Sequence, residues 1–201
     1  MYPVPRVSEQ HLAARRRQIV DAARRCFVRD GFHRTTMQDV IAEAGLSVGA
    51  VYRYFPSKAD LINAIAEEAV GGVGEILADL IRRDPPPPLL DALDRALEYV
   101  ETQMGDDGVV RIAIQVWGEA QREPALAAFV ARTYDGIRSN FETLARRAQR
   151  TGEVPPDADP EAVGAALFAL VPGWFLQCIL TGRPDRATYL AGVRALLRPG
   201  G

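Results

Sequence analysis

The sequence is poor in the residues that hold metals or form disulfides. Its 201 residues include two cysteines, Cys26 and Cys178, and two histidines, His11 and His33. It has no C-x-x-C, H-E-x-x-H or E-x-x-H pattern, which excludes the common zinc and di-iron arrangements. The chain also lacks a recognisable signal peptide, so we expect two free thiols in a reducing cytoplasm. We therefore expect neither a metal ion nor a cofactor.

Strand patterns are also scarce. Val, Ile and Thr do not alternate with polar residues, and apolar residues recur at spacings of three and four, as they do along amphipathic helices. Clusters of Gly and Pro separate these segments. The sequence thus predicts an all-α fold of about nine helices, over residues 8–30, 36–44, 47–54, 57–83, 89–104, 109–122, 124–151, 159–181 and 185–197.

The net charge of −2 hides an uneven distribution. Residues 1–58 contain ten basic and five acidic residues, and residues 59–201 contain 14 basic and 21 acidic ones. The net charge is therefore +5 in the first segment and −7 in the second. Such a split points to a nucleic-acid-facing or membrane-facing segment at the N-terminal end.

One stretch lacks charge altogether. Residues 162–182 contain no Asp, Glu, Lys or Arg, and 21 residues suffice to cross a bilayer. Pro172, Gly173 and Gln177 interrupt this stretch, and small residues are common in it. We therefore expect a helix buried between protein layers or between subunits, and no membrane span.

Residues 36–54 show the pattern of two short helices joined by a tight turn. Gly45 stands where the first helix would need a left-handed C-cap, and Thr36-x-x-Asp39 reads as a capping box at its start. Ser57-x-x-Asp60 repeats that box before a later helix, and Ser47 can cap the second short helix. Helices this short are not stable alone and must pack on the helix expected over 8–30. Two short helices joined by a tight turn and packed in this way form a helix-turn-helix.

The second short helix has side chains suited to DNA. Gly49 and Ala50 allow close approach of the backbone, and Arg53 can reach a guanine edge or a phosphate. Lys58 is the only lysine in the chain, and it opens the next helix, where an anion is favoured. The predicted DNA-binding residues are Thr35, Thr36, Ser47, Val48, Gly49, Ala50, Tyr52, Arg53, Tyr54 and Lys58.

The same residues carry a family resemblance. The block Gly45-Leu46-Ser47-x-Gly49-x-x-Tyr52-x-Tyr54-Phe55-x-Ser57-Lys58, with its neighbours over roughly residues 12–62, resembles the DNA-binding domain of the TetR family of transcriptional regulators. One departure is Ile41, where the family often has Ala. The resemblance implies a DNA-binding domain over 1–58 and an effector-binding and dimerisation domain over 59–201. It also implies a homodimer, usually a repressor, that a small-molecule effector releases from its double-stranded DNA operator.

Within the second domain we predict an apolar effector cavity and a dimer interface. The absence of basic residues from 162–182 favours a neutral or cationic lipophilic ligand. Candidate effector-binding residues are Met104, Trp117, Gln121, Tyr134, Phe141, Trp174, Phe175 and Gln177, each of which is equally compatible with a packed core. Candidate dimer residues near the C-terminus are Ala165, Phe168, Ala169, Pro172, Tyr189, Val193, Leu196 and Leu197.

Some alternatives remain at this point. Gly45-Leu46-Ser47-Val48-Gly49 matches the G-x-S-x-G nucleophile elbow of hydrolases, but a helical pattern precedes it and no histidine follows it. We therefore expect no enzyme. A helical scaffold or adaptor without DNA binding is the other alternative. Gly71, Gly72 and Gly74 act either as a flexible point or as sites of close helix packing.

Overall fold

The computed structural model describes residues 9–105 and 109–197. Over these residues it contains nine α-helices and no strand, which confirms the all-α prediction. Their bounds lie within two residues of the predicted ones, and α7 matches its predicted range at both ends. Residue 8, the predicted start of the first helix, lies outside the described part. The helices are α1 (Glu9–Asp30), α2 (Met37–Ala44), α3 (Val48–Tyr54), α4 (Lys58–Arg82), α5 (Leu89–Thr102), α6 (Val109–Ala120), α7 (Pro124–Thr151), α8 (Pro160–Thr181) and α9 (Arg186–Leu197).

The predicted capping residues explain where the short helices begin and end. The Thr36 hydroxyl accepts from the Asp39 N–H, and the Asp39 carboxylate accepts from the Thr36 N–H, so the capping box of α2 is complete. Ser57 and Asp60 form the same box at α4. Gly45 ends α2 with a φ of 64°, in the left-handed region that favours glycine. These local bonds fix the turn between α2 and α3.

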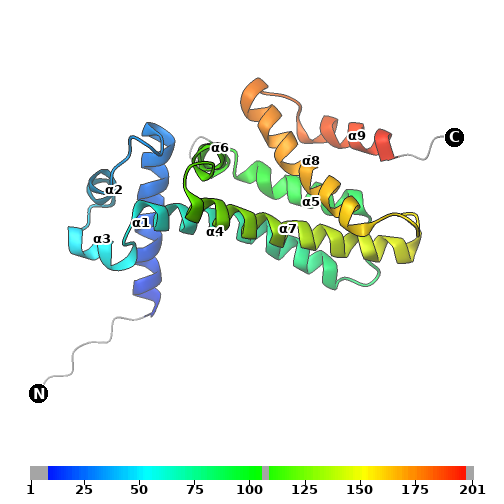
Figure 1. The fold of residues 1–201 in the computed structure, drawn as a ribbon, viewed down its shortest axis with the longest axis horizontal. Helices are drawn as coiled ribbons and strands as arrows, with labels where there is room; N and C mark the ends of the chain where they lie inside the picture. The colour runs from blue at the N-terminus through cyan, green and yellow to red at the C-terminus, as the bar shows by residue number, and fades with distance from the viewer. Residues whose placement is uncertain (1–8, 106–108, 198–201) are drawn as a thin grey trace, which may run out of the picture.

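Helices α1 to α3 form a head at one end of the molecule, and α4 runs from the head into the body (Figure 1). The buried apolar cluster of the head includes Phe27 and Val51, and it continues into α4 with Leu61, Ile62 and Ile65. Residues of α6 and α7, such as Val116 and Phe129, complete this cluster. The first two turns of α4 therefore pack as part of the head. The boundary between the two domains at residue 58 stays a prediction.

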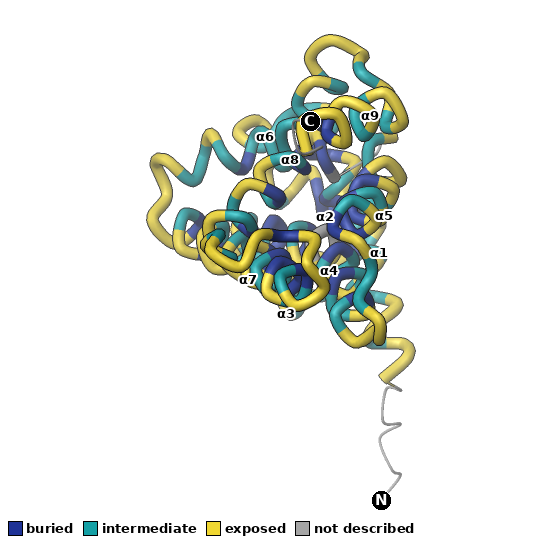
Figure 2. The backbone as a smooth tube through the Cα atoms, turned by 90° about the vertical axis from the view of Figure 1, so that its right-hand side faces the viewer, coloured by how far each residue is buried: buried dark blue, intermediate teal, exposed yellow. Residues whose placement is uncertain are grey.

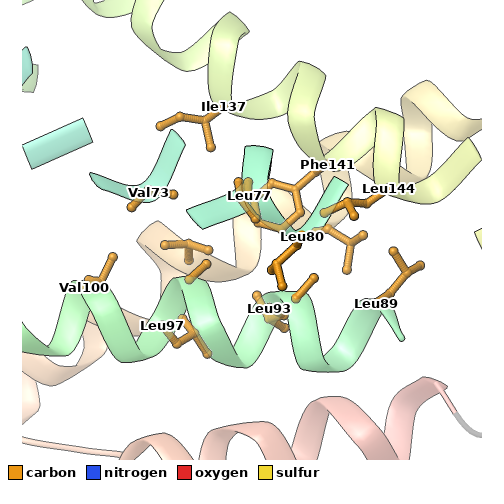
Figure 3. Packing of buried hydrophobic residues seen from close by; sticks show 14 of the residues in the cluster. Val73, Leu77, Leu80, Leu89, Leu93, Leu97, Val100, Ile137, Phe141 and Leu144 are labelled. Atoms are coloured by element: carbon orange, nitrogen blue, oxygen red, sulfur yellow. The ribbon is translucent and has the colours of Figure 1, made fainter. Parts of the chain in front are cut away.

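A second apolar cluster forms the core of the body. Leu77 of α4, Leu93 of α5 and Phe141 of α7 are fully buried in it and point toward one another (Figure 3). Burying a large apolar side chain stabilises the fold by roughly 1.5–3 kcal/mol. This cluster thus holds the three helices together as a platform for α8 and α9.

The glycines of α4 differ in their surroundings. A Cβ atom at Gly72 would lie 2.1 Å from Cζ of the Tyr99 ring on α5, whereas one at Gly71 or Gly74 would meet no atom of the described residues within 4 Å. Gly72 therefore allows α4 and α5 to pack closely at Tyr99. For Gly71 and Gly74 both alternatives, flexibility and packing, remain open.

Candidate DNA-binding surface and ligand cavity

Helix α3 buries one edge and exposes the rest. Val51 is buried, and Phe55, the residue after the helix, is buried with it. Val48 and Tyr52 lie on the other side of the helix and keep 48% and 42% of their surface exposed. The head core therefore fixes α3 and turns the opposite side of the helix to the solvent.

The structure brings most of the predicted DNA-binding residues to this surface. The Ser47 hydroxyl caps α3 by accepting from the Ala50 N–H. Ser47 follows helix α2, and the described residues contain no strand, so the strand–turn–helix context of a hydrolase elbow is missing there. Among the predicted residues, Thr36, Ser47, Val48, Gly49, Tyr52 and Arg53 are exposed, and Ala50 and Tyr54 are half-buried.

Two predicted DNA-binding side chains are directed into the fold. Thr35 is 1% exposed, and its hydroxyl lies 2.8 Å from the Gly31 carbonyl, to which it donates. The Lys58 ammonium donates to the carbonyls of Phe32 (2.8 Å) and Thr35 (3.0 Å) and lies 4.2 Å from the centre of the Phe32 ring. Burial lowers the pKa of Lys58, an effect that the nearby Glu119 carboxylate opposes. Lys58 thus uses two of its three donors to hold the turn between α1 and α2.

Most arginines of α1 are paired within the protein. Arg25 and Arg29 form ion pairs with Glu43 of α2, and Arg16 and Arg24 with Glu68 of α4. Within residues 9–105 and 109–197, four head arginines make no ion pair, namely Arg15, Arg17, Arg34 and Arg53, and Arg15 donates to the neutral Gln18 side chain. The charge count of the sequence therefore overstates how many head cations are free for phosphates.

A cavity of about 130 Å³ lies in the body beside the head. Helix α4 contributes Ile62 and Ile65, and α6 contributes Val116 and Trp117. The remaining lining comes from α5, α7 and α8. The polar positions in this lining are Tyr99, Gln103, Thr133 and Tyr134. The cavity therefore touches both the first turns of α4 and the helices of the body.

Three of the eight predicted effector-binding residues line this cavity: Trp117, Tyr134 and Phe175. Phe141 instead fills the core of the body, and Trp174 is buried with its indole N–H donating to the Pro184 carbonyl (3.1 Å). The other three predicted residues, Met104, Gln121 and Gln177, do not line the cavity. Two residues predicted for the dimer interface, Phe168 and Pro172, are part of the lining.

The lining residues on α4 and α5, and most of those on α6 and α7, were not among the predicted effector-binding residues. Tyr99 lies in the last turn of α5, Gln103 is the residue that follows this helix, and Thr133 adds a polar position on α7. Polar side chains that interrupt an otherwise apolar helix face were the available signal for these positions.

Two models of known protein families match separate parts of the chain. Residues 19–65 match the family model described as bacterial regulatory proteins of the tetR family. Residues 90–199, more than half of the chain, match the model described as the C-terminal part of BetI-type transcriptional repressors. The chain belongs to the TetR family. It is a DNA-binding transcriptional regulator with the helix-turn-helix that the sequence predicts.

Curated relatives of this TetR-family protein are named as regulators rather than as enzymes. An HTH-type transcriptional repressor of Mycobacterium tuberculosis is 48% identical over 134 residues, which cover 62% of this chain and 67% of the relative. The HTH-type transcriptional regulator UidR of Escherichia coli is 26% identical over 187 residues, which cover 90% of each chain.

Solved structures share the fold. GusR of Salmonella enterica superposes with a TM-score of 0.76 at 25% identity, covering 96% of this chain and 97% of that one. A regulator from Saccharomonospora viridis in complex with choline gives 0.71 at 23% identity, covering 92% and 96%. FadR from Bacillus subtilis in complex with stearoyl-CoA gives 0.76 at 18% identity, covering 90% and 96%.

In this TetR-family chain, α8 and α9 leave an apolar surface uncovered. Helix α8 is long and apolar enough to cross a membrane by length and composition, and 28% of its most apolar window is buried. Leu180 and Leu196 are 71% and 85% exposed. Figure 2 shows that most residues along α9 are exposed. Of the predicted dimer residues, Ala169, Leu196 and Leu197 are exposed, Ala165, Phe168, Pro172 and Tyr189 are half-buried, and Val193 is buried.

Helix α6 of the TetR-family body contacts the head directly. The Phe32 N–H donates to Oε1 of Gln115 (2.7 Å), and Nε2 of His33 lies 2.8 Å from Oε2 of Glu119. Another face of the same helix, with Val116 and Trp117, lines the cavity. One short helix thus connects the cavity wall to the turn between α1 and α2.

Proposed function

We propose that this protein is a homodimeric cytoplasmic repressor that binds a palindromic operator and leaves it when a small lipophilic effector fills the cavity. The observation that carries the proposal is the position of the cavity. It is lined by the same helices, α4 and α6, that hold the head in place. A ligand that prefers one arrangement of these helices biases the position of α3.

For the DNA complex, α3 lies in the major groove. Arg53 has no ion pair within the described residues and is exposed, so its guanidinium is available to a guanine edge or a phosphate. Tyr52, Thr36 and Ser47 are exposed beside it and supply hydroxyl groups for phosphate oxygens. We assign Lys58 and Thr35 a positioning role, because their side chains hold the turn that precedes α2.

For the dimer, α8 and α9 pair with their counterparts in a second copy. The exposed Leu180, Leu196 and Leu197 and the uncharged surface of α8 support this arrangement, because such a surface is unfavourable in water. A twofold axis here places two copies of α3 on one face of a palindromic operator. This reading also accounts for the apolar length of α8 without a bilayer.

The decisive experiment is footprinting on the DNA upstream of the protein's own gene, followed by gel-shift titrations. Arg53→Ala is expected to weaken operator binding by about 5- to 150-fold, because a bidentate base contact is worth about 1–3 kcal/mol. Arg150→Ala removes an exposed arginine at the far end of α7 and serves as the matched control.

The salt dependence of operator affinity provides a second readout. Phosphate contacts make affinity fall steeply as the salt concentration rises.

If Arg53→Ala and Arg150→Ala bind the footprinted DNA with equal affinity, α3 is not the DNA-reading helix. If no sequence is protected, the proposal of an operator is wrong and the scaffold alternative gains support.

A further inference from the structure

We infer that the ligand of the cavity is an uncharged, compact, largely apolar molecule about the size of a single ring. This inference rests on the proposed function, since it names the chemical class of the effector. It narrows the sequence-based expectation, which admitted both neutral and cationic lipophilic ligands. The charge of the cavity wall, the geometry of its aromatic rings and the volume of the cavity all favour such a ligand.

The first observation is the absence of charge in the wall. Among the described residues that line the cavity there is no Asp, Glu, Lys, Arg or His. An ion that leaves water for an apolar site loses its hydration, and the cost is large unless an opposite charge pairs with it. An anionic ligand finds no cation here, and a cationic one finds no carboxylate. The described wall therefore favours a neutral molecule.

The second observation concerns the aromatic side chains. Open aromatic faces can bind a quaternary ammonium group without a carboxylate. Here, however, the rings contact one another: Trp117 stacks on Phe175 with centroids 5.5 Å apart and an interplanar angle of 26°, and Tyr134 meets Phe168 edge to face at 5.1 Å. Trp117 also meets Tyr134 at 81° and 6.2 Å. These contacts occupy ring faces and form a packed apolar wall rather than an open cage.

The third observation is the volume. The cavity of about 130 Å³ is close to the engineered apolar cavity of about 150 Å³ that binds benzene. Pockets for drug-sized ligands are about 300–1,000 Å³. A single ring or a branched aliphatic group of similar size therefore fits without rearrangement of the wall.

The polar side chains of the wall set the remaining specificity. Burial raises the pKa of Tyr134 to about 12, an effect that the neighbouring Trp117 indole partly offsets. The Tyr134 phenol is thus neutral over the physiological range and can donate or accept a hydrogen bond. Thr133 and Gln103 also lie in the wall. One hydroxyl or carbonyl group on the ligand can be satisfied there.

The test uses three probes of nearly equal shape and different charge: 3,3-dimethylbutan-1-ol, choline and 3,3-dimethylbutanoate. Choline and the alcohol differ only in the exchange of a charged nitrogen for a carbon atom. We expect isothermal titration of the full-length protein to show that the alcohol binds at least tenfold tighter than either ion. Equal or tighter binding of choline overturns the inference in favour of an ammonium site, and binding by none of the probes overturns it as well.

Two variants establish where the alcohol binds. Ala113→Phe fills the cavity from α6 and is expected to abolish binding, whereas Ala127→Phe adds the same side chain on α7 outside the lining and is expected to leave binding unchanged. Thr133→Val is a milder change. We expect it to weaken binding of the alcohol, while the cavity of this variant still excludes choline and 3,3-dimethylbutanoate. Equal binding by wild type and a folded Ala113→Phe variant overturns the assignment of the site.

The operator assay separates this inference from the proposed function. If the alcohol binds but leaves operator affinity unchanged, the ligand class stands and the proposed release mechanism fails. If choline releases the operator while the alcohol does not, the release mechanism stands and the inferred ligand class is wrong.

Discussion

The three glycines of α4 predict opposite effects of one and the same substitution. Replacing Gly by Ala inside a helix stabilises it by about 1 kcal/mol when the new methyl group meets no neighbour. That condition holds at Gly71 and Gly74, where a Cβ atom meets no atom of the described residues within 4 Å. We therefore expect Gly71→Ala and Gly74→Ala each to raise the free energy of unfolding by about 1 kcal/mol.

At Gly72 the sign reverses. The new Cβ atom would lie 2.1 Å from the Tyr99 ring, so the ring or the α4–α5 spacing must shift. Overpacking of this kind costs about 1–3 kcal/mol. The gain in helix propensity is about 1 kcal/mol, so it offsets the smallest of these costs and is outweighed by the larger ones. Since the contact is with the phenol end of the half-buried Tyr99 side chain, which also lines the cavity, we place Gly72→Ala at a net loss of up to about 2 kcal/mol.

Urea unfolding followed by circular dichroism measures these differences as shifts of the midpoint. The double variant Gly72→Ala/Tyr99→Ala provides the control, because removing the ring removes the clash and the two substitutions should then be strongly non-additive. If Gly72→Ala is as stable as Gly71→Ala, the reasoning from the α4–α5 contact is refuted.

Further predictions concern the link to the head, the capping box and the dimer. Gln115→Leu leaves the Phe32 N–H without its acceptor, at a cost of about 1–3 kcal/mol, so the ligand-induced loss of operator affinity in gel shifts should shrink severalfold. The control is Gln121→Leu, at an exposed position just after α6. An unchanged ligand effect in Gln115→Leu argues against a connection from the cavity to the head through α6. Hydrogen bonds from Thr36 lower the pKa of Asp39, so its stabilising contribution is present above about pH 4 and is lost as the pH falls through the lowered pKa. The stability difference between wild type and Asp39→Asn, measured by urea unfolding, should therefore be larger at pH 6 than at pH 3, and the opposite order contradicts this assignment. Leu180→Glu places a charge on the exposed surface of α8 and should yield monomers in sedimentation velocity, whereas a dimer of unchanged strength places the interface elsewhere.

The head was predictable because its determinants are local. Thr36, Asp39 and Gly45 act through bonds to residues within a few positions, so their roles follow from spacing alone. The inward direction of Lys58 was not predictable in this way. It depends on carbonyls of Phe32 and Thr35, more than twenty residues away, that only the packed head brings to the ammonium group.

The cavity was less predictable than the head because its wall comes from five helices. Phe141 and Phe168 are both apolar aromatics on helices, and nothing in their neighbours along the chain separates them. The packing of α4 against α5 and α7 buries Phe141 in the core, whereas Phe168 lines the cavity on α8. The family resemblance predicted a cavity, and the packing of the helices determines which residues line it.

The position of the cavity also bears on how cooperatively the chain unfolds. Its wall draws on both apolar clusters, with Ile65 and Phe129 from that of the head and Val100 and Ile137 from that of the body. Empty space at this seam forfeits the dispersion contacts that would otherwise join the two clusters. We therefore expect the unliganded protein to unfold as two weakly coupled units, and a bound ligand to make the two clusters melt together.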